Sequence, residues 1–173
     1  LDVSGQTQSE SSFAPIGEVV LSNLDKLNAL QQHDGAITGV PTGFKDVDHV
    51  FNGLQKSDLI LVAARPAMGK TAFTLNIAQN VTMLYDKTVA FFSLEMGKEQ
   101  LASRFLSSEA LIESQKLKTG NLDGDDWVKI ARASGVLAGL NIYVDDNPAI
   151  TAAEIKAKCR RLGDELGLIV IDY

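Results

Sequence analysis

The chain has 173 residues, of which 45% are hydrophobic and 22% charged, fractions typical of a soluble globular protein rather than a disordered segment or a coiled coil. With 16 lysines and arginines against 22 aspartates and glutamates, the net charge is -6. A generally basic surface is therefore excluded, and any contact with DNA has to be local. The single cysteine, Cys159, excludes an internal disulfide framework and favours a reducing, cytoplasmic location. No apolar run is long enough to span a membrane, and the N-terminus carries no signal sequence.

The N-terminal region is expected to hold a tail followed by one helix. Residues 1–15 are rich in serine, glutamine and glycine and are predicted to form a flexible linker. Apolar residues at helical spacing from Ile16 to Leu30 predict an amphipathic helix. Its apolar face is expected either to pack on its own domain or to dock on a neighbouring subunit. The start at Leu1 rather than Met indicates a piece of a longer chain.

The rest of the chain alternates apolar strands with helices. Strands are expected over 58–64, 88–93, 141–144 and 168–171, and helices over 71–85, 98–110, 125–137 and 151–166. Thr151 and Glu154 form a capping-box signature at the start of the last helix. Continuous apolar strands separated by helices predict an α/β fold with a mostly parallel sheet and helices on both faces.

One loop in this pattern has the residues that phosphate binding requires. It follows an apolar strand, opens a helix and matches G-x-x-x-x-G-K-[ST] except for alanine at the first position; it comprises Ala64, Arg65, Pro66, Ala67, Met68, Gly69, Lys70 and Thr71. Gly69 is expected where a side chain would clash with the phosphates. Backbone N–H groups and the helix N-terminus would face the anion. Lys70 is expected to reach the β- and γ-phosphates of ATP, and the Thr71 hydroxyl to ligate Mg²⁺.

Two acids follow predicted strands at the edge where parallel sheets bind ligands. Asp172 ends the last strand and is expected to accept hydrogen bonds from water bound to Mg²⁺. Glu95 follows the strand over 88–93 and is a candidate for polarising the attacking water. A helix-capping role for Glu95 remains open at this point, since acids favour helix N-termini.

The other polar residues have simpler explanations. His33 and His49 lack metal-ligand spacing. Asp145 and Asp146 either take part in a turn before Asn147 or lie at the same sheet edge. A basic cluster is expected to form a solvated face rather than a DNA contact; it comprises Lys156, Lys158, Arg160 and Arg161.

Several separate motifs resemble the bacterial replicative DNA helicases of the DnaB type. They are TGVPTGFKDVD, which starts at Thr38, and ARPAMGKTAF, FFSLEMGKEQLASR, IYVDDNPAI, KCRRL and IVIDY. The resemblance covers 16–173 and implies a RecA-like P-loop NTPase fold. It implies a linker helix over 16–35 that packs on the adjacent subunit, and an ATPase domain over 36–173 that ends just after the Walker B acid.

The same resemblance implies the activity, partners and residue roles. It implies a homo-hexameric ring that hydrolyses MgATP, translocates on single-stranded DNA and unwinds the duplex at the replication fork. Lys70 and Thr71 match the P-loop pair, Asp172 the Walker B acid and Glu95 the catalytic glutamate. Primase and a helicase loader are the implied partners, with no membrane. DNA-binding loops and an arginine finger would lie beyond Tyr173, so this piece alone is expected to turn over slowly.

Two other functions are left open. One is a module that mainly binds nucleotide and docks subunits through the helix from Ile16 to Leu30. The other is a related RecA-fold ATPase of the recombination or circadian type, which Gln100 and Arg104 after the SLEM run disfavour.

Overall fold

The computed structural model describes residues 13–31 and 37–173. Most of the predicted tail over 1–15, and the turn that holds His33, lie outside the described residues. The chain divides into two units, Leu1–Ala36 and Ile37–Tyr173, and each is described by itself. In the first unit, α1 spans Ile16–Gln31, as the spacing of its apolar residues predicts.

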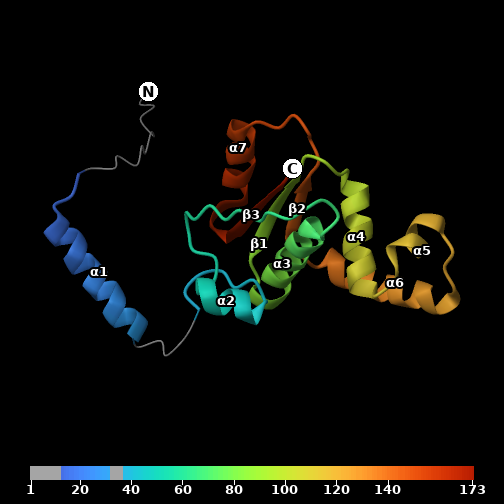
Figure 1. The fold of residues 1–173 in the computed structure, drawn as a ribbon, viewed down its shortest axis with the longest axis horizontal. Coiled ribbons are helices and arrows are strands. Elements are labelled where there is room, and N and C mark those ends of the chain that lie inside the picture. The colour runs from blue at the N-terminus through green and yellow to red at the C-terminus, as the bar shows by residue number, and fades with distance from the viewer. Residues whose placement is uncertain (1–12, 32–36) are drawn as a thin grey trace, which may run out of the picture. The chain divides into compact units, whose positions relative to one another are not determined.

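The second unit alternates helices with parallel strands (Figure 1). Two short helices, α2 and α5, were not expected, because neither is long enough to show a helical period. In chain order the elements are α2 (Lys45–Phe51), α3 (Lys70–Tyr85), β1 (Thr88–Ser93), α4 (Lys98–Ala110), α5 (Ser114–Thr119), α6 (Gly124–Ala138), β2 (Ile142–Asp145), α7 (Ala152–Leu162), a 3₁₀ turn (Gly163–Glu165) and β3 (Leu166–Asp172).

The three strands form one parallel sheet in the order β2-β1-β3. All six residues of β1 are buried, as expected for a central strand between two layers. The register places Phe92 opposite Asp145 and Ser93 opposite Asp172. The carboxyl ends of all three strands therefore meet at one edge of the sheet, which is the edge where ligands bind in such folds.

Alternate residues of β1 enter two separate cores. On one face, Val89 and Phe91 pack with residues of α3 and α4, among them Val81 and Leu101. On the other face, Ala90 and Phe92 pack with Cys159 of α7. Helices thus cover both faces of the sheet, which confirms the predicted α/β class.

The expected strand over 58–64 is wrong. These residues have no regular secondary structure, and Leu59 and Leu61 are 86% and 76% exposed. A strand needs a hydrogen-bonding neighbour, whatever its composition. Within the part of the chain that the structure describes, residues 58–64 pair with no strand, and the outer edge of β3 stays unpaired. The apolar composition of residues 58–64 was therefore not enough to make them a strand.

The last helix is shorter than expected. It ends at Leu162 rather than near residue 166, and β3 begins at Leu166. The cause is Gly163, whose φ of 66° and ψ of -151° lie in a region open essentially only to glycine. The chain reverses there and brings β3 back beside β1.

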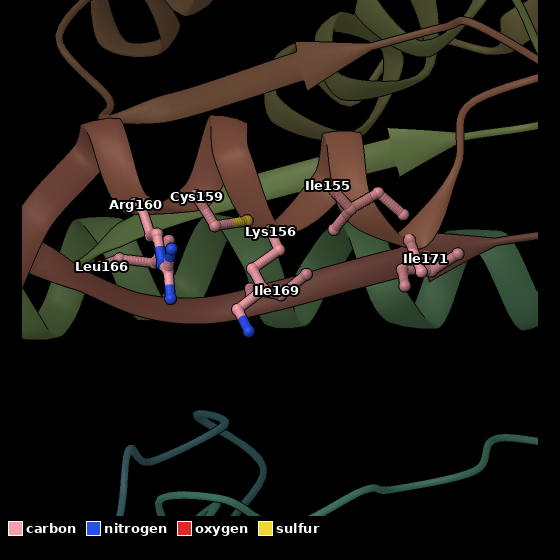
Figure 2. Close-up of a pocket in the computed structure, with 8 residues that line it drawn as sticks. Ile155, Lys156, Cys159, Arg160, Leu166, Ile169 and Ile171 are labelled. Atoms are coloured by element: carbon pink, nitrogen blue, oxygen red, sulfur yellow. The ribbon is translucent and has the colours of Figure 1, made fainter. Parts of the chain in front are cut away.

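An open groove lies between α7 and β3 (Figure 2). Its volume is about 420 Å³, and Ile155, Ile169 and Ile171 supply apolar walls. The buried Cys159 also lines it, and burial raises the pKa of this thiol.

Among the described helices, none combines the length and apolarity that crossing a bilayer requires.

Two capping boxes fix helix starts. The predicted box at Thr151 and Glu154 is confirmed, with Glu154 Oε2 accepting from the Thr151 N–H at 2.8 Å. A second box at the start of α6 was missed: Asp123 Oδ1 accepts from the Asp126 N–H at 2.8 Å. Asp126 also forms an ion pair with Lys116 at 2.9 Å, which ties α5 to α6.

The Thr151→Ala variant should be less stable than wild type by about 1 kcal/mol, because the helix loses the hydroxyl that caps it. Thr151→Ser keeps the hydroxyl and should stay near wild type. Urea unfolding measures both variants. Equal losses for alanine and serine would show that the hydroxyl contributes nothing.

The ion pair at Asp126 predicts a pH-dependent stability. The hydrogen bond from Lys116, followed by that from the Asp123 N–H, holds the pKa of Asp126 below its ordinary value. The contribution is therefore present above the unfolded pKa of about 4 and is lost as the pH falls through the folded value. Asp126→Asn should destabilise the protein at pH 7, and its deficit relative to wild type should shrink below about pH 4. Urea unfolding across this range, with the exposed Asp125→Asn as control, tests this; a constant deficit would contradict it.

Candidate functional site

The loop before α3 has the backbone conformation of an anion-binding nest. It is exposed from Ala64 to Gly69, and α3 begins directly after it at Lys70. Ala67 and Gly69 have φ of 63° and 85°, in the left-handed region. Alternation of left-handed with right-handed residues turns successive N–H groups toward one side of a loop. The loop therefore suits a phosphate at the N-terminus of α3.

The backbone angle of Gly69 accounts for glycine at this position, because L residues rarely adopt a φ of 85°. A Cβ built on Gly69 meets no atom of the protein within 4 Å. A clash with a phosphate concerns only the nucleotide-bound protein.

Three predicted site residues converge at the carboxyl edge of the sheet. Thr71 Oγ1 donates a hydrogen bond to Asp172 Oδ2 at 2.8 Å. Lys70 Nζ lies 3.3 Å from Asp172 Oδ1. The Asp172 side chain is 3% exposed and that of Lys70 is 30% exposed. A buried carboxylate is thus paired with a lysine that still reaches solvent, as binding a soluble anion requires.

Tyr173 also contacts the lysine, and no sequence signal pointed to it. Its carbonyl oxygen accepts a hydrogen bond from Lys70 Nζ at 2.7 Å. Its ring centroid lies 5.2 Å from the same nitrogen, within cation–π range. These contacts hold the Lys70 ammonium beside the end of β3.

Glu95 lies close in the chain to the residues that pair with β3. Ser93 is opposite Asp172 in the register, and the Leu94 N–H donates to the Asp172 carbonyl at 2.8 Å. Ser93 Oγ, another group that the sequence did not single out, accepts from the Met96 N–H at 3.2 Å. The Glu95 side chain itself is exposed. The residue before Glu95 is therefore hydrogen-bonded to Asp172, while Glu95 itself is exposed.

The donor set fits a magnesium nucleotide. A threonine hydroxyl and a carboxylate at hydrogen-bond distance are hard oxygen ligands, which Mg²⁺ prefers together with phosphate oxygens and water. The described residues contain no group of three or more histidine, cysteine or acidic side chains able to hold a metal by themselves.

Asp145, the last residue of β2, and Asp146, which follows it, combine both roles left open for them. Asp145 Oδ1 accepts from the Asn147 N–H, which is turn chemistry, and its other oxygen pairs with Lys158. These hydrogen bonds, that from Lys158 first, keep the pKa of Asp145 below its ordinary value. Asp146 Oδ2 accepts from the Lys98 N–H at 3.0 Å and thereby joins the end of β2 to the start of α4.

The remaining candidates lie elsewhere. His49 is in the last turn of α2, and the cluster of basic residues on α7 is exposed, as expected. Lys156 and Arg160 line the groove on α7, which includes none of Lys70, Thr71 or Asp172.

Comparisons with known proteins agree with this geometry. The family model of the DnaB-like helicase C-terminal domain matches residues 39–173. The chain is 51% identical over 170 residues to the replicative DNA helicase DnaC of Bacillus subtilis and 49% identical over 170 residues to the replicative DNA helicase DnaB of Geobacillus stearothermophilus. Each match covers 97% of this chain, which spans only 37% of either relative.

Solved structures give the same result for the fold. A solved ATPase domain superposes with a TM-score of 0.82 at 32% identity, covering 94% of this chain and 58% of the other. A DnaB-like replicative helicase, solved in a study of its interactions with primase, gives 0.81 at 32% identity and covers 94% and 39%. The fold is therefore the RecA-like α/β fold that the motifs predicted, and the chain belongs to the family of DnaB-like helicase C-terminal domains.

Proposed function

We propose that this chain is the nucleotide-binding part of a replicative DNA helicase motor that hydrolyses MgATP. The observation that carries the proposal is the contact of Lys70 and Thr71, at the start of α3, with Asp172, at the end of β3. A phosphate loop, its lysine and an acid on a neighbouring strand are the parts from which P-loop NTPases are built. The relatives' names as replicative DNA helicases support the same function.

Each residue has a defined role in this proposal. Residues 64–69 would hold phosphate oxygens through backbone N–H groups, and Lys70 would move from Tyr173 and Asp172 to the β- and γ-phosphates. Thr71 Oγ1 would ligate Mg²⁺, and Asp172 would accept hydrogen bonds from metal-bound water. When bound, Mg²⁺ neutralises charge that develops on the phosphates. Glu95 would orient and polarise the attacking water.

The proposed assembly is a homo-hexameric ring that translocates on single-stranded DNA. In it, α1 would pack on the adjacent subunit, and primase and a helicase loader would be partners of the whole protein. The apolar stripe of α1 supports the packing, and the interactions with primase of the structurally similar replicative helicase support that partner. The alternatives of a mere docking module and of a recombination-type ATPase predict no strand displacement on forked DNA. The cytoplasmic location stays a prediction.

Lys70→Ala should abolish tight nucleotide binding, because the loop loses the ammonium that contacts the phosphates. Glu95→Gln should keep binding but reduce the hydrolysis rate about 10²-fold or more, because it removes the base without altering the loop. Binding of a fluorescent ATP analogue and steady-state ATPase of the full-length protein measure these effects, with Lys156→Ala as the control. ATP-driven unwinding by Lys70→Ala would refute the proposal.

Deleting residues 1–33 should abolish ring assembly, because it removes the apolar stripe that docks on the neighbour. Nucleotide binding by the remainder should persist, since no site residue lies in the deleted segment. Size-exclusion chromatography with light scattering measures the oligomer. An unchanged oligomer would exclude docking through α1.

A further inference from the structure

The helix that follows Glu95 begins without a cap of its own. The residue just before α4 is Gly97, which has no side chain to accept from the first N–H groups. That acceptor comes from a distant residue instead: Asp146, 48 positions after Lys98, accepts from the Lys98 N–H at 3.0 Å. Its other oxygen lies 3.8 Å from Lys98 Nζ.

This contact lies at one end of the segment over 94–98, here called the bridge, which contains Glu95 and joins β1 to α4. At the near end, the Leu94 N–H donates to the Asp172 carbonyl, and the Met96 N–H donates to Ser93 Oγ. At the far end, Asp146 ties Lys98 to the end of β2. Glu95 therefore lies between an attachment to β3 and an attachment to β2, the two strands that flank β1.

Glu95 lies between two residues that pack against the cores, Leu94 and Met96. Its side chain is exposed, so its position depends on the backbone that carries it. A group that orients water has to be held within a fraction of an ångström, and a misplacement of 1 Å can cost about 10²-fold in rate. Loss of the Asp146 contact would remove the hydrogen bond that ties this segment to the end of β2, and would allow such a displacement.

We infer that Asp146 is a positioning residue for hydrolysis, which holds the segment bearing Glu95 against the carboxyl edge of the sheet through the N-terminus of α4. The inference rests on the proposed function of Glu95. It assigns Asp146 a role in the hydrolysis step and none in nucleotide binding, because the carboxylate contacts Lys98 rather than the phosphate loop. The adjacent Asp145 is not part of the bridge, since its partners are Lys158 and Asn147.

Steady-state ATPase of the full-length protein tests the inference. Asp146→Ala should lower kcat about tenfold with an unchanged KM and unchanged affinity for a fluorescent ATP analogue. Asp146→Asn retains an oxygen that accepts from the Lys98 N–H and should restore kcat to within about twofold of wild type. Asp145→Ala is the matched control and should leave kcat within the same range. A wild-type kcat for Asp146→Ala, or an equal defect in Asp145→Ala, would overturn the inference.

A double variant separates positioning from helix capping. Gly97→Ser can cap α4 locally, because its backbone is extended and a Cβ there meets only Asp146 Oδ2, at 3.9 Å. Asp146→Ala should lower the melting temperature because α4 loses its cap. Adding Gly97→Ser should restore the melting temperature but not kcat, since the hydrogen bond between the start of α4 and Asp146 after β2 is still missing. Recovery of kcat together with the melting temperature would show that Asp146 only stabilises the helix.

Glu95→Gln in the same assay separates the two proposals. A Glu95→Gln variant as active as wild type would refute the proposed role of Glu95. An inactive Glu95→Gln together with a fully active Asp146→Ala would refute the positioning role alone.

Discussion

The candidate site depends on one buried carboxylate, that of Asp172. It receives the Thr71 hydroxyl and the Lys70 ammonium, and so joins the start of α3 to the end of β3 across 101 residues of chain. A buried charge is tolerated only when it is paired and hydrogen-bonded. The pairing therefore holds the start of α3, which directly follows the loop over 64–69, at the carboxyl end of β3.

The parallel register determines what else reaches this edge. Because Ser93 and Phe92 of β1 lie opposite Asp172 and Asp145, the residues that follow all three strands come together. The backbone of Leu94 is bonded to Asp172, and Asp146 is bonded to the first residue of α4. Within the described residues, every buried side-chain nitrogen or oxygen has a hydrogen-bond partner. The edge is thus a connected set of polar contacts on an apolar sheet, an arrangement that limits the movement of its members.

The sequence predicted much of the fold because its signals were local. The helical period predicted α3 and α4, and the Thr151 capping box predicted the start of α7. Prediction failed where the outcome depended on remote partners. Residues 58–64 have the composition of a strand but pair with no strand among the described residues. Tyr173 contacts Lys70 through its backbone carbonyl and its ring, two contacts that depend on the pairing of β3 with β1.

By itself, the sequence determined the chemical groups of the site. Gly69, Lys70 and Thr71 are adjacent in the chain, so their spacing alone predicts a phosphate loop at a helix start. The sequence also predicted Asp172 at the ligand-binding edge, and only the tertiary structure decided which strands pair and which remote groups are in contact there. Asp172 reaches Thr71 because β3 pairs with β1, and Asp146 reaches Lys98 because β2 pairs with β1 on its other side. Strand pairing is a long-range contact, and a pattern of neighbouring residues holds no record of which strands pair.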